Sequence, residues 1–150
     1  MKNIIRPAEA KDIDFIIEAN AKISEASDPD NVAVGLRERV LSDILSDNPK
    51  AFVLIMEADG AQIGMALYAF AYFANEGRIM WLSQIYVREE NRKFGAAMRL
   101  MNALKKEAAR TGCYAICGGV GDENIRAKKV YKFTGAKELD NYKLFYAEVD

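Results

Sequence analysis

Apolar residues in the first third of the chain recur every three or four positions, which is the spacing of amphipathic helices. This pattern predicts one helix over residues 8–23 and a second over residues 36–48. A short apolar run at residues 2–6, ended by Pro7, predicts a strand before them. Residues 24–35 contain an Asp-Pro dipeptide typical of turns, so they are predicted to be the loop between the two helices.

The middle of the chain has the apolar runs and turn residues of β-strands. Residues 51–58 and 61–73 flank Asp59-Gly60, a dipeptide typical of tight hairpins, and residues 78–87 are a third predicted strand. Along residues 61–73 both faces are apolar, and one face carries Tyr68, Phe70 and Tyr72. A strand that is apolar on both faces is expected in the middle of a sheet.

The last third alternates helices and strands. An apolar stripe after Gly95 predicts a helix that ends before Gly112, followed by a strand at residues 113–120 and a helix at residues 122–133. Residues 136–149 predict a closing hairpin. The whole order, β-α-α-β-β-β-α-β-α-β-β, is typical of a mixed α/β domain in which an antiparallel meander leads into a β-α-β crossover. We therefore expect a single domain over residues 1–150.

The composition narrows the class of function. The 150 residues are 51% apolar and 29% charged, with a net charge of −1, so nothing in the charge favours nucleic acid or an anionic membrane as a partner. The longest apolar run, Met65 to Ala74, is far shorter than the roughly 20 residues of a membrane-spanning helix. The first residues lack the apolar core of a signal peptide, so the expected location is the cytoplasm.

The chain has no histidine and only two cysteines, Cys113 and Cys117. The lack of histidine excludes Ser-His and Cys-His nucleophilic sites and most zinc sites, so we expect no metal. On a strand, residues four apart lie about 13 Å from each other on one face, which is beyond the reach of a disulfide. The two cysteines are therefore expected to be reduced residues of the core.

Two segments are candidates for binding chemistry. In the first, Gly95, Ala96 and Ala97 begin a helix directly after Arg92 and Lys93. Exposed amides at a helix N-terminus bind anions, and a glycine lets a ligand approach the backbone closely. The alternative is ordinary packing of a small-residue helix start, and two preceding glutamates oppose anion binding unless they point to solvent.

The second segment is the helix at residues 122–133. Asn124, Ala127 and Tyr131 have the spacing i, i+3 and i+7, which places an amide, a small residue and a phenol on one face. Such a stripe can line a cleft. The alternative is a surface helix with a half-buried tyrosine.

Together the two segments resemble the GNAT superfamily of acetyl-CoA-dependent N-acetyltransferases. The family signature Q/R-x-x-G-x-G/A matches Arg92 to Ala97, directly after the strand "WLSQIYV", and N-x-x-A-x-x-x-Y-x-x-x-G matches Asn124 to Gly135. The resemblance covers essentially all of residues 1–150. It implies a central, largely antiparallel sheet of about seven strands flanked by four helices, with the fourth and fifth strands splayed apart.

The resemblance also implies where acetyl-CoA would bind. The diphosphate would lie on the backbone amides of the signature turn, formed by Arg92, Lys93, Phe94, Gly95, Ala96 and Ala97, with Met98 next in the helix. The pantetheine arm would pair with the preceding strand at Ile85, Tyr86 and Val87, as an added strand does. The amide of Ile85 would stabilise the oxyanion as the acceptor amine attacks.

The same resemblance assigns the proton transfers. Tyr131 would be the general acid that protonates the leaving CoA thiolate, or would only position the cofactor, and Asn124 would hold the CoA arm or a water. Many relatives have a glutamate on the fourth strand as the base, but Ser83 and Gln84 occupy that region here. The base is left open among water, a backbone carbonyl and the carboxylates of Glu25, Glu76 and Glu123.

The acceptor would meet the first two helices and the third strand. Glu25, Asp28 and Asp30 could attract a cationic amine, although a solvated turn is the simpler interpretation. Tyr68, Phe70 and Tyr72 could form the floor of an amine pocket through cation–π contacts, although core packing is the simpler interpretation. Ser83 is a further candidate for contact with the acceptor.

The leading prediction is an enzyme that moves an acetyl group from acetyl-CoA to a primary amine by direct attack in a ternary complex. A small-molecule acceptor is favoured over a protein or peptide, because the chain has no accessory module for peptide docking. The alternatives are a catalytically weak acyl-CoA-binding or sensing domain and a nucleotide-binding domain built on Gly118 to Gly121, which lacks the usual glycine spacing. The apolar residues 142–149 add a homodimer as a further prediction.

Overall fold

The computed structural model describes residues 2–27 and 35–149; the side chains of residues 25–27 and of Phe94 fall outside this description. Its strands are β1 (Asn3–Pro7), β2 (Phe52–Ala58), β3 (Ala61–Phe73), β4 (Gly77–Val87) and β5 (Ile116–Cys117). Its α-helices are α1 (Ile13–Ser27), α2 (Leu36–Arg39), α3 (Ala96–Arg110) and α4 (Ile125–Phe133). Short turns of other helical types are η1 (Ala10–Asp12), η2 (Val40–Ile44) and η3 (Glu89–Phe94).

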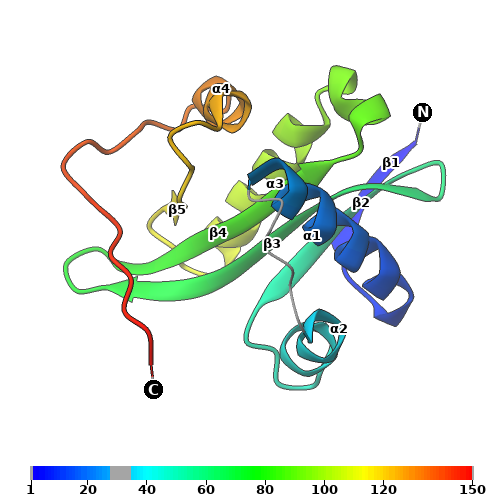
Figure 1. The fold of residues 1–150 in the computed structure, drawn as a ribbon, viewed down its shortest axis with the longest axis horizontal. Coiled ribbons are helices and arrows are strands. Elements are labelled where there is room, and N and C mark those ends of the chain that lie inside the picture. The colour runs from blue at the N-terminus through cyan, green and yellow to red at the C-terminus, as the bar shows by residue number, and fades with distance from the viewer. Residues whose placement is uncertain (1, 28–34, 150) are drawn as a thin grey trace.

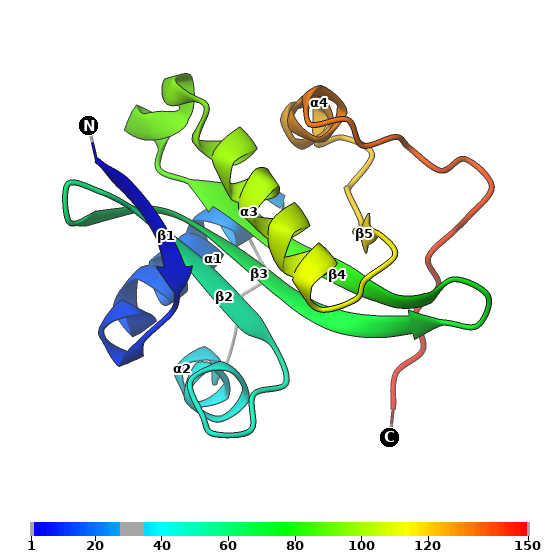
Figure 2. The same ribbon diagram turned by 180° about the vertical axis from the view of Figure 1, so that it is seen from behind.

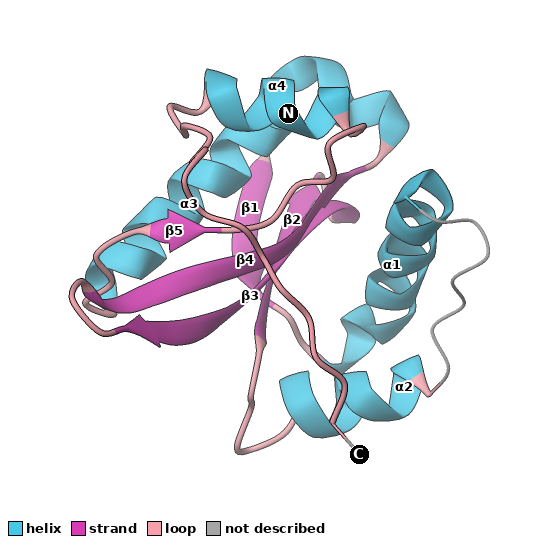
Figure 3. Ribbon diagram, turned by 60° about the vertical axis from the view of Figure 1, so that its left-hand side comes forward, coloured by secondary structure: helices cyan, strands magenta, loops and turns pink. Residues whose placement is uncertain are grey.

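The strands form one sheet in the order β1-β2-β3-β4-β5 (Figure 1). The first four strands are antiparallel neighbours, and β5 is parallel to β4. Helices α1 and α2 lie on one side of the sheet and α3 on the other, as Figures 2 and 3 show from two directions. The fold is therefore the mixed α/β arrangement that the sequence predicts.

The core is divided by the sheet into two clusters. Leu54 and Met56 of β2 pack toward α3, whereas the alternate residues Val53 and Ile55 pack toward α1. Successive side chains of a strand point to opposite faces, so a strand covered on both faces needs a continuous apolar run. β3 lies between β2 and β4 and contributes to both clusters, which confirms its predicted central place.

Local sequence explains the turns that organise this core. The β2–β3 hairpin turns at Asp59 and Gly60, whose φ values are 49° and 85°. Two consecutive positive φ angles are typical of the tight hairpin turn that an Asp-Gly dipeptide favours. Helix α3 is rich in Ala, Leu, Met and Lys, which are strong helix formers, and the chain turns away just after it at Gly112.

A buried carboxylate ties the first strand to the rest of the sheet. Asp12 is fully buried and accepts hydrogen bonds from both terminal nitrogens of Arg6 (2.7 and 2.9 Å), from the amide of Glu9 (2.7 Å) and from Gln62 Nε2 (2.6 Å). Burial by itself raises the pKa of Asp12, but the bonds from Arg6, Glu9 and Gln62 outweigh it and lower the pKa to about 2. Asp12 therefore stays ionised and holds β1, η1 and β3 together.

An irregularity in β4 opens the sheet. Leu67 pairs with Gln84 and Tyr68 with Leu82, so Ser83 is an extra residue in β4, which is the arrangement of a β-bulge. β5 pairs with β4 only at Met80–Ile116 and Trp81–Cys117. Beyond this point, within the described residues, β4 has no partner strand on the β5 side. The predicted separation of the fourth and fifth strands is confirmed.

The expectation of about seven strands is not confirmed, since the sheet has five strands within the described residues. The predicted closing hairpin at residues 136–149 has no strand, and the predicted strand at 113–120 is reduced to Ile116–Cys117. A strand needs an edge to pair with, and the edge that β5 offers is two residues long. Cys113 and Cys117 are free thiols and half-buried.

No helix in the described part of the chain combines the length and the apolar character needed to cross a membrane.

Candidate active site

The turn between β4 and α3 is the segment that the sequence predicts as an anion site. η3 follows β4, and Gly95 then takes the left-handed conformation (φ 69°, ψ 20°) as the N-cap of α3. Residues with a Cβ adopt the left-handed conformation only at a cost in free energy, so glycine suits this position. No side chain caps the helix start, and its first amides at Ala96, Ala97 and Met98 therefore remain available to an anion.

Several cations surround this turn. Arg92 and Lys93 are exposed, and Arg99 Nη1 lies 3.6 Å from the position that a Cβ on Gly95 would take. Arg92 Nε donates a hydrogen bond to the carbonyl of Val87 (2.8 Å), so the side chain folds back onto the end of β4. Glu89 and Glu90, which would oppose anion binding if they faced the turn, are exposed.

A further cation, Arg126 on α4, was not predicted from the sequence. Burial lowers the pKa of Arg126 first, and the positive charge of Arg92 lowers it further. The carboxylate of Glu89 acts in the opposite direction and raises the pKa of Arg126, so it partly offsets the repulsion between the two guanidinium groups. An anion placed between η3 and the start of α4 would relieve the rest of that repulsion.

The bulge at Ser83 determines which backbone groups of β4 face the open side. The carbonyl of Leu82, before the bulge, lies 2.7 Å from the position of a Cβ on Gly118, so it points toward β5. The carbonyl of Tyr86, after the bulge, lies 2.8 Å from the position of a Cβ on Gly64, so it points toward β3. Backbone groups alternate along a strand, and therefore the amide and carbonyl of Ile85 and Val87 point away from β3 into the opening.

A cleft of about 170 Å³ fills the opening between β4 and α4. It brings together four residues that the sequence singled out: Ser83, Ile85, Asn124 and Tyr131. Gln84 and Ala127 also line it, so the predicted face of α4 is the one turned to the cleft.

The cleft also has lining residues that sequence reasoning did not assign to it, namely Ile23 and the segment Gly119 to Gly121. Ile23 belongs to the apolar stripe of α1, and nothing in its spacing distinguishes a cleft residue from a core residue. The glycines were noted only as a weak nucleotide motif. Gly118 has a packing role instead, because a side chain there would collide with the carbonyl of Leu82.

Tyr131 is half-buried, and burial raises the pKa of its phenol. It also packs against the core cluster on the α3 side, which fixes its ring. Asn124 is the N-cap of α4, and its Oδ1 accepts a hydrogen bond from the amide of Ala127 (3.1 Å). The carbonyl end of Asn124 thus stabilises the helix, and its amino group is the end suited to a ligand.

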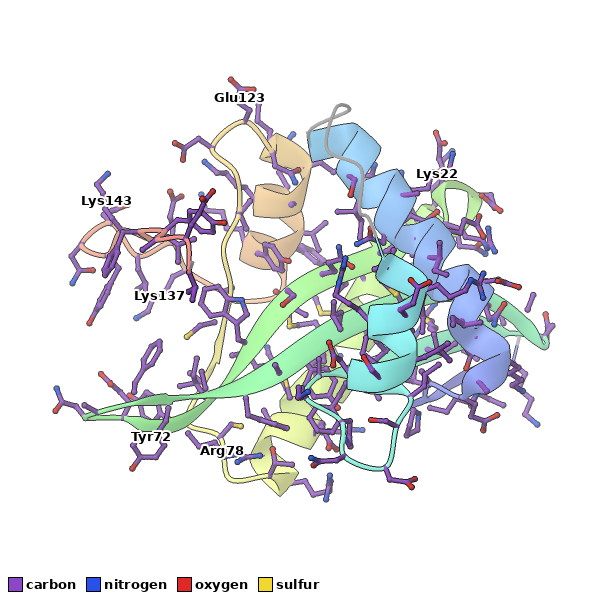
Figure 4. All side chains as sticks on the ribbon, turned by 60° about the horizontal axis from the view of Figure 1, so that its bottom comes forward. Lys22, Tyr72, Arg78, Glu123, Lys137 and Lys143 are labelled. Atoms are coloured by element: carbon purple, nitrogen blue, oxygen red, sulfur yellow. The ribbon has the colours of Figure 1, made fainter. Side chains whose placement is uncertain are left out.

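The three aromatic residues of β3 do not line the cleft, so their predicted role as the floor of an amine pocket is not supported. Tyr68 is buried against Phe52 in the core under α3, and burial together with Glu107 raises its pKa to about 12. The Arg78 guanidinium stacks on the Phe70 ring at 3.9 Å. Tyr72 is exposed at the far end of the β3–β4 hairpin (Figure 4).

The candidate bases and acceptor carboxylates are only partly described. Glu76 and Glu123 are exposed and do not line the cleft; Figure 4 shows Glu123 pointing outward beside α4. Glu25 lies at the end of α1 with its side chain outside the description, and Asp28 and Asp30 lie outside the described residues. Among the described residues, no group of His, Cys, Asp and Glu side chains is arranged to hold a metal ion.

Comparisons with known proteins define the class of this fold and site, which is that of an acyltransferase. The chain matches the acetyltransferase (GNAT) family over residues 18–136 and belongs to that family.

Three similar proteins show how closely it is related. The chain is 27% identical over 144 residues to the thialysine N-epsilon-acetyltransferase of Bos taurus, covering 91% of this chain and 85% of that protein. A possible acetyltransferase from Clostridium difficile 630 has the same fold, with a TM-score of 0.81, 22% identity and coverage of 100% and 99% of the two chains. AAC(6')-Iy, solved with the bisubstrate analog CoA-S-monomethyl-acetylneamine, gives a TM-score of 0.76, 19% identity and coverage of 99% and 100%.

Proposed function

We propose that this acyltransferase moves an acetyl group from acetyl-CoA to a primary amine of a small molecule, by direct attack within a ternary complex. The observation that supports the proposal is the bulge at Ser83, beyond which Ile85 lines the same cleft as Tyr131. The anion-binding turn at Gly95 follows the same strand.

The residues present fit acetyl-CoA, which would supply an activated acyl thioester. The amides after Gly95 would hold its diphosphate, aided by the positive charges of Arg92, Lys93 and Arg126. The backbone amide and carbonyl of Ile85 and the amide of Val87 would hydrogen-bond the pantetheine arm, much as an edge strand accepts another strand, while the carbonyl of Val87 accepts a hydrogen bond from Arg92. Asn124 lines the same cleft, and its amino group would contact the same arm.

Tyr131 is suited to act as the general acid. Its burial disfavours the phenolate, so the group keeps its proton at neutral pH and can donate it to the departing sulfur. The amide of Ile85 would donate a hydrogen bond to the oxyanion that forms when the amine nitrogen attacks the thioester carbon. One such donor is typically worth about 3 kcal/mol of the activation barrier.

The amine must lose a proton, and the described cleft has no carboxylate to take it. Ser83 and Gln84 line the cleft and can hydrogen-bond an amine or a water, but neither ionises near neutral pH. The proton then leaves through water, a backbone carbonyl or a carboxylate such as Glu25. This gap is the specific observation that favours the alternative, a weak acyl-CoA-binding domain.

A small-molecule acceptor is supported by two comparisons. The Bos taurus relative is a thialysine N-epsilon-acetyltransferase, and AAC(6')-Iy was solved with an acetylneamine conjugate. Thialysine and neamine are both small molecules with primary amines. Peptides remain a class to include in the test.

The test is release of free thiol from acetyl-CoA in the presence of thialysine, lysine, spermidine, neamine and a short peptide with a free N-terminus. An enzyme releases thiol with at least one amine, and Tyr131→Phe lowers kcat by about 10²-fold or more while the Kd for CoA holds. Tyr114→Phe, at an exposed tyrosine outside the cleft, is the matched control and keeps full activity. If CoA raises the Tm but no amine is acetylated, the acyl-CoA-binding alternative replaces the proposal.

A further inference from the structure

The helix that carries Tyr131 has little buried surface to hold it in place. None of the residues of α4, Ile125–Phe133, is buried, and Tyr131 itself packs only partly against the core cluster on the α3 side. Between residues 121 and 149 the one buried residue is Thr134, directly after the helix. A general acid must stay within reach of its target atom, so other contacts have to fix the position of this helix.

Thr134 closes the end of α4 at the carbonyl of Tyr131. Its hydroxyl Oγ1 donates a hydrogen bond to that carbonyl (2.6 Å), and its amide donates to the same oxygen (3.1 Å). The amide of Ala136 is a third donor to the Tyr131 carbonyl (3.0 Å). The last carbonyls of a helix have no partner within the helix, and here the residues that follow supply the partners. The backbone of Tyr131 is therefore held by the turn that Thr134 begins.

Lys105 of α3 connects this turn to the rest of the domain. Its Nζ donates a partly buried hydrogen bond to the carbonyl of Thr134 (2.9 Å), and α3 crosses the sheet with α4 at its side (Figure 2). A bond from an ammonium group is stronger than one between neutral groups, and a cation at the C-terminal end of a helix also interacts favourably with the helix dipole. The end of α4 is thus fastened to α3.

Helix α3 relates this attachment to the proposed cofactor site. The helix begins at Ala96, beside the amides proposed to hold the diphosphate, and Lys105 lies nine residues further along it. At 1.5 Å per residue, this separation is about 14 Å along the helix axis. In contrast to α4, α3 has five buried residues along one face: Ala96, Leu100, Met101, Leu104 and Ala108. A firmly packed helix therefore carries the anion-binding turn at one end and holds the end of α4 near the other.

We propose that Lys105 and Thr134 are positioning residues that hold the phenol of Tyr131 at the cleft. Neither side chain lines the cleft, so both act through Tyr131 and not on the substrate. The inference rests on the proposed acetyl transfer, which gives Tyr131 its chemical role. It adds two residues that lie outside both sequence motifs or at a position that the motif leaves unspecified.

The first experiment compares kcat and the Kd for CoA in matched lysine variants. Lys105→Met removes the ammonium group but keeps a similar side-chain stem and helix propensity, and Lys106→Met makes the same change at the exposed neighbouring lysine. We expect kcat to fall about tenfold in Lys105→Met alone, because a small displacement of a catalytic group slows the reaction, while the Kd for CoA changes less than twofold. Lys105→Arg, which can donate to the same carbonyl, should restore kcat. Equal kcat in the two methionine variants overturns the proposal.

The second experiment asks whether the two residues act through the phenol. Lys105→Met and Thr134→Val are each combined with Tyr131→Phe in a double-mutant cycle. Positioning residues lower kcat in the wild-type background but leave the residual kcat of Tyr131→Phe unchanged, since no acid is left to position. Thr134→Ser keeps the hydroxyl and should keep most of the wild-type kcat. A second tenfold loss in the Tyr131→Phe background reveals a different role and overturns the proposal.

A third measurement follows the Tyr131 ring without requiring turnover. In the full chain with tyrosine labelled at ¹³Cζ, the Tyr131 signal among the seven tyrosines is the one that Tyr131→Phe removes. It should shift in Lys105→Met, return in Lys105→Arg and stay in place in Lys106→Met. A signal that does not move in Lys105→Met overturns the positioning role even where acetyl transfer is confirmed. A wild-type protein that acetylates no amine refutes the proposed function instead, and the attachment of Tyr131 is then judged by this signal alone.

Discussion

Replacement of Gly95 by alanine should separate the folding role of this residue from its role in binding. Gly95 has φ 69°, and a Cβ there would meet only Arg99 Nη1 at 3.6 Å, which is ordinary contact. The cost to the fold is therefore the backbone strain alone, about 1 kcal/mol. For a domain of this size, a loss of that amount lowers the Tm by roughly 2–4 °C.

Gly112 provides the matched control at the other end of the same helix. Its φ is 77°, and a Cβ there would meet nothing within 4 Å, so Gly112→Ala should lower the Tm by a similar amount. Only Gly95→Ala puts a methyl group where the diphosphate of CoA would approach the amides of Ala96 and Ala97. We expect its Kd for CoA to rise about tenfold or more, equivalent to about 1.4 kcal/mol, whereas Gly112→Ala keeps the wild-type Kd.

The assays are thermal unfolding without ligand and calorimetric titration with CoA below the Tm. The anion-site reasoning is refuted if Gly95→Ala binds CoA as tightly as wild type, or if Gly112→Ala loses as much affinity as Gly95→Ala. A Tm loss in Gly95→Ala several times that in Gly112→Ala would refute the argument that strain alone sets the folding cost.

Three further predictions concern stability and pH. Asp12→Asn should lower the free energy of unfolding at pH 7 by about 2–3 kcal/mol, as measured in urea titrations. Because the fold lowers the pKa of Asp12 from 3.8 to about 2, this stabilisation is present above pH 4 and is lost as the pH falls through 2. Equal unfolding free energies for wild type and variant at pH 7 would contradict this prediction. Arg88 donates two hydrogen bonds to Glu18 (2.7 and 3.2 Å) on a partly exposed surface. Alanine variants of both residues in a double-mutant cycle should therefore show a coupling free energy of about 0.5–1 kcal/mol. Strictly additive losses of unfolding free energy would count against the pair. Burial raises the pKa of Tyr131, so the phenol should stay protonated up to about pH 10, the ordinary phenol pKa. The ratio of kcat between wild type and Tyr131→Phe should persist over this range. A ratio that falls to one below pH 9 would exclude the phenol as the acid.

Most elements up to α4 could be predicted from the sequence because they depend on local patterns; β5, which is reduced to Ile116–Cys117, is an exception. The Asp59-Gly60 dipeptide, the apolar run of β2 and the stripe of α3 act within a few residues of each other, and the structure has all three where the pattern placed them. The turn at Gly95 belongs to the same group, because glycine tolerates the left-handed conformation that the chain takes before this helix.

Features that depend on distant partners could not be predicted in this way. Residues 136–149 have the alternation of strands, but a strand also needs a free edge, and the sequence does not show which edges are free. The alternation of Tyr68, Phe70 and Tyr72 was recognised correctly. Whether their shared face meets the cleft or α3 depends on how the sheet is covered, and these residues lie on the α3 side or at the hairpin end.

The bulge at Ser83 shows most clearly how one residue connects the fold to the proposed chemistry. Without the extra residue, alternation from Leu82 would point the backbone groups of Ile85 toward β3, where they would only complete the ladder. With the extra residue, the carbonyl of Leu82 points toward Gly118, whereas the backbone groups of Ile85 point into the cleft that Tyr131 also lines. The same strand therefore joins the sheet in its first part and is available to bind a ligand in its last part. Serine and glutamine in this stretch fit the proposed mechanism. In it, the backbone of β4 rather than its side chains would bind the ligand, and the base would not be a side chain of this strand.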